Sequence, residues 1–534
     1  MTIETSTPHA ALLSLHPKTI TVKLPYLPCI IPSFPIILGF LFLTAKIAVA
    51  ESIVTYEEFG AKGDGITDDL PAICQAHEHA NKNNLAVKSK ADATYHLGSK
   101  PLTAIIATDT DWNSSRFIID DTAASINSNK PIFDVRSLSN TIPLKITNLK
   151  RGQKSLAARP PTECLVFVEN NQKKLYIRKG LNQNSGSPQR EVFILNSDGS
   201  IADDIDWDYD SITGLSAKPI DKKTLLLKGG VFTNIPNQLS PEKNPHYWLR
   251  NIRISRSKTV VDGVTLKIAD HYKPSHPYQG FLDASRCAKI VFRNCTIDAR
   301  KYYKKIGSAG KSVPMGTYGY SANLVSDFRM INCRMGNDIQ DQNLWGIVGT
   351  NFMKNFLVED CSLNRVDVHQ GVSGKYIIRR TTLGHAGLNA VGRGELIVED
   401  STIHGANLVR FREDYGSTWE GDVSISNSKW IPKSDGFSQL AIFGISNTET
   451  HDFGYPCYMP QNIKIDGLSI DDSRHGKNYQ GPSFFGNPLG KSTTKPPFPM
   501  HRTKSIEVKN FSTSSKLPFR ISDNPSVSDA IKVR

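Results

Sequence analysis

Closely spaced cysteine pairs are missing from this chain. It has eight cysteines among 534 residues and no Cys-x-x-Cys motif. Seven remain when the first 50 residues are set aside, and an odd number with no such motif predicts no disulfide framework. Stability must therefore come from a hydrophobic core. The length suits one elongated solenoid better than several separate globules.

A long uninterrupted apolar run is also missing. The apolar stretch 24–50 is broken by four prolines, and its proline-free core, 36–44, is far shorter than the ~20 residues of a membrane-spanning helix. It ends in Ala48-Val49-Ala50, which is typical of a signal-peptide cleavage site. We expect residues 1–50 to be removed as a signal peptide. The mature protein would then be secreted or periplasmic, with no stable membrane insertion.

Acidic residues are outnumbered by basic ones. The chain has 64 Lys and Arg against 51 Asp and Glu, a formal charge of +13. Residues 1–50 hold three lysines and one glutamate, so the remainder still carries +11. A basic surface favours an anionic partner.

A short motif recurs at a fixed interval in the second half of the chain. The stretches Asp360–Leu363, Arg380–Leu383 and Asp400–Ile403 begin 20 residues apart, and each follows a β-rich run. A fixed interval in this range, with one β-run per interval, is typical of a solenoid. Looser copies begin at Asn294, Asn332, Asn427 and Gly467. We predict an all-β protein, a right-handed parallel β-helix, with consecutive coils from Asn294 to Ile470.

One column of this repeat holds small residues. Cys361 aligns with Thr381 and Ser401 in the neighbouring copies, and Cys295 and Cys333 precede it in the same column. Free cysteine packs as a small hydrophobic residue. We therefore interpret the column as a packed corner of the coil, without redox or metal chemistry.

The chain after the leader opens with the glycine-rich stretch 59–69, Phe-Gly-Ala-Lys-Gly-Asp-Gly-Ile-Thr-Asp-Asp. This stretch resembles the N-terminal signature of the pectate-lyase-like β-helix superfamily, which includes polygalacturonases, polysaccharide lyases and phage tailspikes. Asp68 or Asp69 can N-cap a helix over Leu70–Lys82. The resemblance implies that this helix covers the open end of the β-helix. It does not choose between enzyme and binding protein, because the fold hosts both.

The predicted organisation has four parts. They are a signal peptide (1–50), an N-terminal cap with the first coils (51–140), irregular coils or an inserted β-subdomain (141–245), and the main β-helix (246–534). Within the third part, Leu165–Val168 and Leu175–Arg178 flank the turn-like Asn170–Gln172, which predicts a hairpin. Glu191–Ile194 is a further expected strand.

Polar residues gather on the strands that follow the 20-residue motif. With the interval kept constant, His369 aligns with Asn389, and Arg410 and Arg412 lie on the next coil. Equivalent positions on neighbouring coils lie about 4.8 Å apart. This density of His, Arg, Asn and Tyr resembles the sugar-binding face of β-helix polysaccharide lyases, including those acting on glycosaminoglycans. The chemical roles below are inferred from residue type, since no lyase motif matches.

Cleavage of a uronate polymer by elimination needs a carboxylate neutraliser, a base and an acid. We predict His369 or His385 as base and Tyr415 as acid. The predicted substrate-binding residues are Asn389, Arg393, Arg410, Arg412 and Trp419. Bound Ca²⁺ is an alternative neutraliser, and its candidate ligands are Glu413, Asp414, Asp367 and Asp338, although no calcium-loop motif supports it. No other cofactor is predicted.

The predicted function is a secreted lyase acting on an anionic polysaccharide. Chondroitin or dermatan sulfate and hyaluronan come first, then pectate and alginate, and no nucleic-acid partner is expected. One alternative is a polygalacturonase-like hydrolase, although the adjacent Glu413 and Asp414 would point to opposite faces of a strand. The other is a non-catalytic adhesin or tailspike-like binding protein. The oligomeric state stays open.

Overall fold

The computed structural model describes residues 53–178, 185–239, 247–270, 275–306, 313–445, 452–486, 500–529 and 531–534. The predicted signal peptide, 1–50, lies outside these residues. Within them, no helix is long and apolar enough to cross a membrane.

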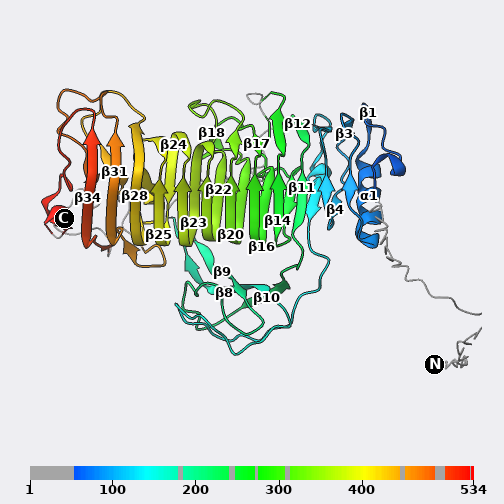
Figure 1. The fold of residues 1–534 in the computed structure, drawn as a ribbon, viewed down its shortest axis with the longest axis horizontal. Coiled ribbons are helices and arrows are strands. Elements are labelled where there is room, and N and C mark those ends of the chain that lie inside the picture. The colour runs from blue at the N-terminus through cyan, green and yellow to red at the C-terminus, as the bar shows by residue number, and fades with distance from the viewer. Residues whose placement is uncertain are drawn as a thin grey trace, which may run out of the picture. The chain divides into compact units, whose positions relative to one another are not determined.

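The unit from residue 51 onward is a right-handed parallel β-helix, as predicted (Figure 1). Its coils stack along one axis, and strands pair in parallel from coil to coil. Apolar side chains of alternate strand residues fill the interior of the stack, where Phe328, Phe356 and Tyr376 lie face to face on successive coils. The first coils use β1 (Asp64–Asp68), β2 (Val87–Lys88), β3 (Thr94–Leu97), β4 (Ala104–Ile106), β5 (Thr110–Asp111), β6 (Arg116–Asp120) and β7 (Phe133–Val135).

The later coils include three whose paired residues Phe356, Tyr376 and Leu396 are 20 apart. They are built from β11 (Leu225–Lys228), β12 (Val231–Ile235), β13 (Ile252–Ile254), β14 (Thr259–Asp262), β15 (Thr265–Ile268), β16 (Leu282–Arg293), β17 (Thr296–Ile297), β20 (Tyr320–Ile331), β21 (Arg334–Met335), β22 (Val348–Glu359), β23 (Ser362–Arg379), β24 (Thr382–Ala390), β25 (Gly392–Glu399), β26 (Thr402–Gly405), β27 (Val409–Phe411), β28 (Trp419–Pro432), β29 (Ala441–Gly444), β31 (Asn462–Ile470), β32 (Ser483–Phe485), β34 (Ser505–Thr513) and β35 (Lys532–Val533). The predicted run of coils from Asn294 to Ile470 is confirmed by their parallel pairing.

The helix α1 (Leu70–Asn83) lies at the N-terminal end of the stack, as predicted (Figure 1). Leu70, Ile73 and Ala76 on its inner face are fully buried. The Asp69 carboxylate accepts the backbone N–H groups of Lys62 and Gly63, so it fastens the glycine-rich turn to the start of the helix. The glycine-rich signature therefore has a structural role here.

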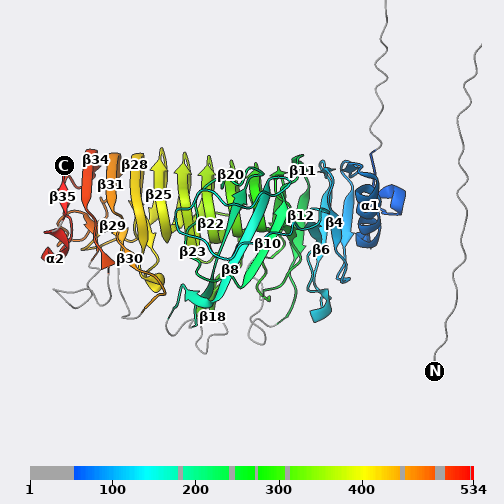
Figure 2. The same ribbon diagram turned by 90° about the horizontal axis from the view of Figure 1, so that it is seen from below.

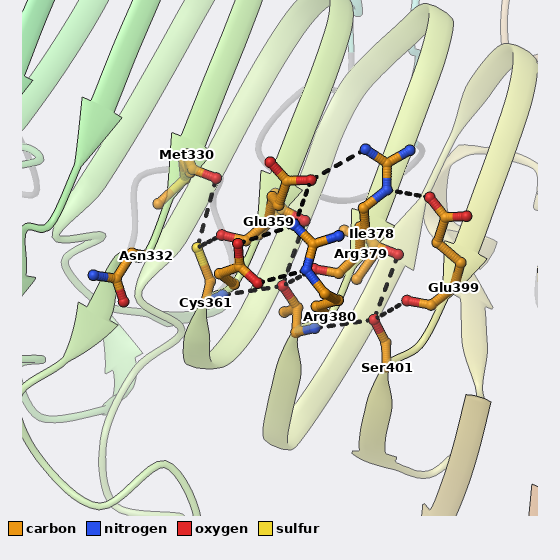
Figure 3. A network of polar contacts seen from close by, with 12 residues as sticks. Met330, Asn332, Glu359, Cys361, Ile378, Arg379, Arg380, Glu399 and Ser401 are labelled. Atoms are coloured by element: carbon orange, nitrogen blue, oxygen red, sulfur yellow. Dashed lines mark hydrogen bonds and ion pairs between the residues drawn. The ribbon is translucent and has the colours of Figure 1, made fainter. Parts of the chain in front are cut away.

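The small-residue column forms one corner of the coil (Figure 3). The backbone N–H of Cys361 donates to the Thr381 hydroxyl, and the N–H of Thr381 donates to the Ser401 hydroxyl. The residues that precede them, Asp360, Arg380 and Asp400, have φ of 54°, 45° and 49°. Asp tolerates this left-handed conformation better than most residues, and Arg380 forms an ion pair with Asp360 across the corner at 2.7 Å. The seven cysteines of the described residues are free, in agreement with the sequence.

The inserted β-subdomain is an antiparallel sheet of β8 (Cys164–Leu175), β9 (Ser187–Leu195) and β10 (Gly214–Pro219). Figures 1 and 2 show that it lies against one side of the stack. Leu165 and Val192 pack there on Ala288 and Leu324 of the coils. The predicted hairpin between 165–168 and 175–178 is wrong, because β8 runs through its proposed turn and pairs with β9. The expected strand at Glu191–Ile194 is confirmed within β9.

Candidate functional site

The outer face of β23 carries three polar side chains at alternate positions: Arg365, Asp367 and His369. Alternate residues of a strand share a face, and the intervening Val366 and Val368 are fully buried in the core. Thr350 of the preceding coil pairs with Val368, whereas Asn351 pairs with Gln370. His369 is therefore the extra residue of a β-bulge. Bulges re-aim side chains and are frequent next to active sites.

Asp367 is the centre of the cluster. Its side chain is 1 % exposed, and its Oδ2 atom lies 2.7 Å from an Arg365 guanidinium nitrogen and 3.3 Å from His369 Nε2. Its Oδ1 atom accepts Asn389 Nδ2 and Arg412 Nη1, each at 2.8 Å. Although burial opposes ionisation, these neighbours hold the pKa of Asp367 well below its usual range. Asp367 is therefore a permanent carboxylate that orients its donors.

Tyr318 reaches this carboxylate from two coils away. Its hydroxyl donates to Asp367 Oδ2 at 2.7 Å and lies 3.1 Å from His369 Nε2. The approach needs a glycine on the intervening coil, because a Cβ at Gly349 would lie 2.6 Å from the Tyr318 ring. Burial, followed by the Asp367 charge, raises the pKa of Tyr318 well above its usual value, so the phenol keeps its proton.

These contacts assign the tautomer of His369. The Tyr318 hydroxyl donates its hydrogen to Asp367, so the Tyr318 and Asp367 oxygens that face His369 Nε2 can only accept. His369 Nε2 must therefore carry the ring hydrogen. Nδ1 is then the basic nitrogen. Burial lowers the pKa of His369 to about 4, with Arg412 and Arg365 acting in the same direction and Asp367 opposing them. His369 is neutral near pH 7 and can accept a proton.

A hollow of about 840 Å³ adjoins the cluster. Arg365 and Asn389 belong to both, whereas His369 does not line the hollow. Among the described residues that line it, four are Lys or Arg and none is Asp or Glu. They are Lys301, Tyr302, Gln342, Asn343, Leu344, Trp345, Gly346, Arg365, His385, Ala386, Gly387, Leu388, Asn389, Gly405, Ala406, Asn407, Arg410 and Lys433. Such a lining suits an anionic ligand.

Three of the predicted residues line this hollow. Asn389 also binds Asp367, and Arg410 is half exposed and forms an ion pair with Glu413 at 2.7 Å. His385 Nδ1 donates to the carbonyl of Ile339 at 3.1 Å, and burial lowers its pKa. No contact within the described part of the chain joins His385 to His369.

Arg412 and Arg393 are engaged with other parts of the protein. Arg412 bridges Asp367 and Asp414, so it braces the cluster from the next coil. Arg393 donates to the backbone carbonyl of Asp206 in the inserted subdomain at 2.6 Å. We predicted that Arg393 binds a sulfate or a second uronate, but in the structure its guanidinium holds the insert against the coils.

Tyr415 and Trp419 are both fully buried. The Tyr415 ring packs edge-on against Tyr176 of the insert, and the indole N–H of Trp419 donates to the carbonyl of Asp422. A sugar on the surface cannot reach either side chain, so the predicted roles of proton donor and aromatic platform are corrected. The prediction placed these two side chains on the surface because they lie in a polar run, but an aromatic residue in such a run can still face the core.

The 20-residue alignment of His369 with Asn389 is also wrong. Val366 pairs with Leu388, an interval of 22, and Asn389 pairs with Arg410, an interval of 21. Asn389 therefore stands beside Asp367, and it meets His369 only through that carboxylate. The slip arises between Leu363 and Arg365, where the interval between paired residues of β23 and β24 changes from 20 to 22.

The predicted Ca²⁺ ligands are engaged in other contacts. Asp367, Asp414 and Glu413 form ion pairs with arginines, and Asp338 accepts the backbone N–H of Gln340. Across the described ranges, no group of three or more His, Cys, Asp or Glu side chains is placed to hold a metal. These four carboxylates do not fit a calcium site.

Sequence reasoning missed Arg365 and Tyr318 as members of the cluster. Arg365 had a readable signal, since polar residues alternate with valines through Arg365–His369. Tyr318 had none, because it lies 49 residues from Asp367 in the chain.

No family model matches this chain. A capsule depolymerase specific for capsule KL64, from Klebsiella phage P510, is 28 % identical over 120 residues. That alignment covers 20 % of this chain and only 12 % of the depolymerase. The tailspike gp61 of Pseudomonas phage phi297 superposes with a TM-score of 0.51 at 12 % identity, covering 86 % of this chain and 80 % of the tailspike. The chain thus has the β-helix fold of a phage tailspike and a partial sequence likeness to a phage depolymerase.

Proposed function

We propose that this protein is an exported enzyme that degrades an acidic polysaccharide. The observation that carries the proposal is the hollow whose described lining residues include four cationic side chains and no carboxylate, next to a neutral histidine held by Asp367. The likeness to a capsule depolymerase supports a polysaccharide substrate. A bacterial capsular polymer therefore joins the glycosaminoglycans, pectate and alginate as a candidate substrate class.

The reaction proposed is β-elimination. His369 Nδ1 takes the proton next to the uronate carboxylate, the electron pair forms the new carbon–carbon double bond, and the glycosidic C–O bond breaks. The imidazolium formed on His369 then returns its proton to the leaving oxygen. Arg365 and Arg410 neutralise the uronate carboxylate, which makes the abstracted proton more acidic, and Lys433 adds positive charge that binds the polymer.

Hydrolysis is less well supported. It needs two carboxyl groups about 5–9.5 Å apart, and one of them must keep its proton. Arginine pairing keeps Asp367 and Asp414 ionised, and it lowers the pKa of Asp414 to about 2 despite its burial. Glu191 has a pKa raised to about 7 by burial, but it belongs to β9 of the insert and lines a pocket of about 70 Å³, well below the ~300 Å³ of ordinary ligand pockets.

Non-catalytic binding is the second candidate. It is favoured by the tailspike-like fold and by Trp345 and Tyr302, whose rings lie 5.3 Å apart at the edge of the hollow. A binding protein would use the same basic hollow and would leave the polymer intact.

A polymer panel separates these functions. Purified protein is incubated with bacterial capsular polysaccharides, chondroitin and dermatan sulfate, hyaluronan, pectate and alginate. Ultraviolet absorbance from an unsaturated product supports elimination. New reducing ends without that absorbance indicate hydrolysis. Retention of a polymer at its original length indicates a binding protein.

A further inference from the structure

The inserted subdomain reaches the candidate site through one arginine. β8 ends at Leu175, and Arg178 follows it in the chain before β9. Arg178 Nη2 lies 2.7 Å from Asp414 Oδ2, and its guanidinium carbon stands 5.0 Å from the centre of the Tyr415 ring. Both side chains of the ion pair are less than one-fifth exposed.

A chain of ion pairs continues from Asp414 to His369. Arg412 binds Asp414 with two nitrogens, Nε at 2.9 Å and Nη2 at 2.7 Å. Its third nitrogen, Nη1, binds Asp367 Oδ1 at 2.8 Å. The other oxygen of Asp367 lies 3.3 Å from His369 Nε2. The order is Arg178, Asp414, Arg412, Asp367, His369.

The backbone is shaped for this approach. A Cβ at Gly371, two residues after His369, would lie 2.1 Å from the Tyr176 hydroxyl. Gly371 has φ of 86°, so the absence of a side chain serves both the conformation and the contact. The adjacent Gln370 donates to the Ser187 hydroxyl of the insert at 2.7 Å. The insert therefore contacts β23 immediately after His369.

We propose that the inserted subdomain is part of the catalytic machinery and that Arg178 is a positioning residue for His369. This inference rests on the proposed function, in which His369 is the base. Arg178 shares the charge of Asp414, which leaves Arg412 able to span both carboxylates and hold Asp367 against His369. The insert thus does more than cover one side of the stack.

Electrostatics gives the direction of the effect. The groups that set the pKa of His369 are Asp367 and Asp414, which raise it, and Arg412 and Arg365, which lower it together with burial. Tyr318 is the remaining titratable neighbour and stays protonated. Loss of Arg178 removes a positive charge and leaves more of the Asp414 charge uncompensated. The pKa of His369 should therefore rise.

Docking of the insert does not depend on Arg178. Lys354 of β22 forms ion pairs with Glu191 at 3.2 Å and Asp206 at 3.4 Å, and the Ser373 hydroxyl donates to Asp206 at 2.8 Å. A matched control is available in Arg190, which belongs to the same subdomain and has similar exposure. It pairs with Glu169 at 3.3 Å and lies over the Phe352 ring of the coils.

The experiment measures the protonation midpoint of His369 without using activity. Hydrogen–deuterium exchange at the imidazole C2 position, read by mass spectrometry on the peptide that holds His369, is followed across pH. The full chain is compared with Arg178→Ala, Arg178→Lys, Arg190→Ala and Asp414→Asn. Melting temperature and polymer cleavage are recorded in parallel.

We expect the protonation midpoint of His369 to shift in opposite directions when Arg178 and when Asp414 is replaced. Arg178→Ala raises the midpoint by about half a unit or more, Asp414→Asn lowers it, Arg178→Lys largely restores it, and Arg190→Ala leaves it unchanged. If neither Arg178→Ala nor Arg190→Ala changes the protonation midpoint of His369, and both only lower the melting temperature, then Arg178 has a packing role alone and the inference fails. If the midpoints shift as expected while no polymer is cleaved, the coupling stands and the proposed function fails.

Discussion

The corner column and the site strand are two regions of the same coils with opposite kinds of order. In the corner, Cys361, Thr381 and Ser401 keep an interval of 20 and pass hydrogen bonds from coil to coil. Around the site, the interval is 22 between paired residues of β23 and β24 and 21 between those of β24 and β27, and β23 adds one residue as a bulge. The repeat is kept where packing is uniform and is broken where the partly exposed His369 lies beside Asp367.

The largest effect is expected from removing the bulge residue. His369→Ala should lower kcat by ~10²–10⁴, because a general base typically contributes that factor. The melting temperature should stay near that of the parent, since the side chain is partly exposed and packs into no core. A corner variant such as Thr381→Val should show the reverse pattern, with a lower melting temperature and unchanged kcat. A variant with normal turnover and reduced melting temperature would remove His369 from the mechanism.

Asp367→Asn is expected to destabilise the protein by ~3–5 kcal/mol, because it leaves Arg365 and Arg412 largely buried without their shared carboxylate. Chemical denaturation measures this change. The matched control is Asp360→Asn at the exposed corner, where water screens the ion pair with Arg380 and its loss should change the free energy of unfolding little. Equal losses for the two variants would contradict the assignment of Asp367 as the buried centre.

Thr381→Val breaks the corner column while preserving its shape. The buried N–H of Cys361 then loses its hydroxyl acceptor, which should cost ~1–3 kcal/mol in the free energy of unfolding. Cleavage by the folded fraction should be unchanged, because this corner does not line the hollow. Thermal melting and initial rates measured on one preparation test both statements.

Lys433→Ala tests the hollow. Lys433 is exposed and forms no ion pair with any described residue, so its loss should raise KM several-fold and leave kcat nearly constant. The effect should shrink as salt is added, because exposed charges are screened. Lys509→Ala on the last coils is a control in which KM should not change, since Lys509 is exposed, pairs with Glu507 and does not line the hollow.

The smallest effect is expected from mild acidification. With the pKa of His369 near 4, about nine-tenths of the base stays neutral at pH 5, so kcat/KM should fall by only about a tenth between pH 7 and pH 5. A histidine with the ordinary pKa near 6.5 would lose most of its neutral form over that range. A pH–rate profile corrected for the unfolded fraction decides between the two.

Much of the fold could be predicted because its signals are local and repeated. The interval of 20, the Asn and Asp residues at positions of positive φ, and the small residues after them all recur within a short window. The capping helix was equally readable from its glycine-rich turn and its following amphipathic run. The predicted hairpin in 165–178 was wrong because the polar run Asn170–Gln172 looks like a turn. The run is part of a strand, whose partner β9 begins only at Ser187.

The candidate site could be predicted only in part. His369, Asn389 and Arg412 were found because they lie within 43 residues on adjacent coils. Their mutual arrangement was not, because a register slip of two residues changes which side chains become neighbours. Tyr415 and Trp419 were misplaced because residue type alone does not tell inward from outward at a turn.

The parallel β-helix follows from the amino-acid sequence alone, because coil geometry depends on a spacing that the chain repeats. Which polar groups contact one another depends on the packing of the coils and the insert. Tyr318 crosses the gap over Gly349, and Arg178 arrives from an inserted subdomain that follows no repeat. The physical reason is that stacking fixes the distance between coils, whereas the neighbours of Asp367 depend on bulges and long-range docking that no local pattern encodes.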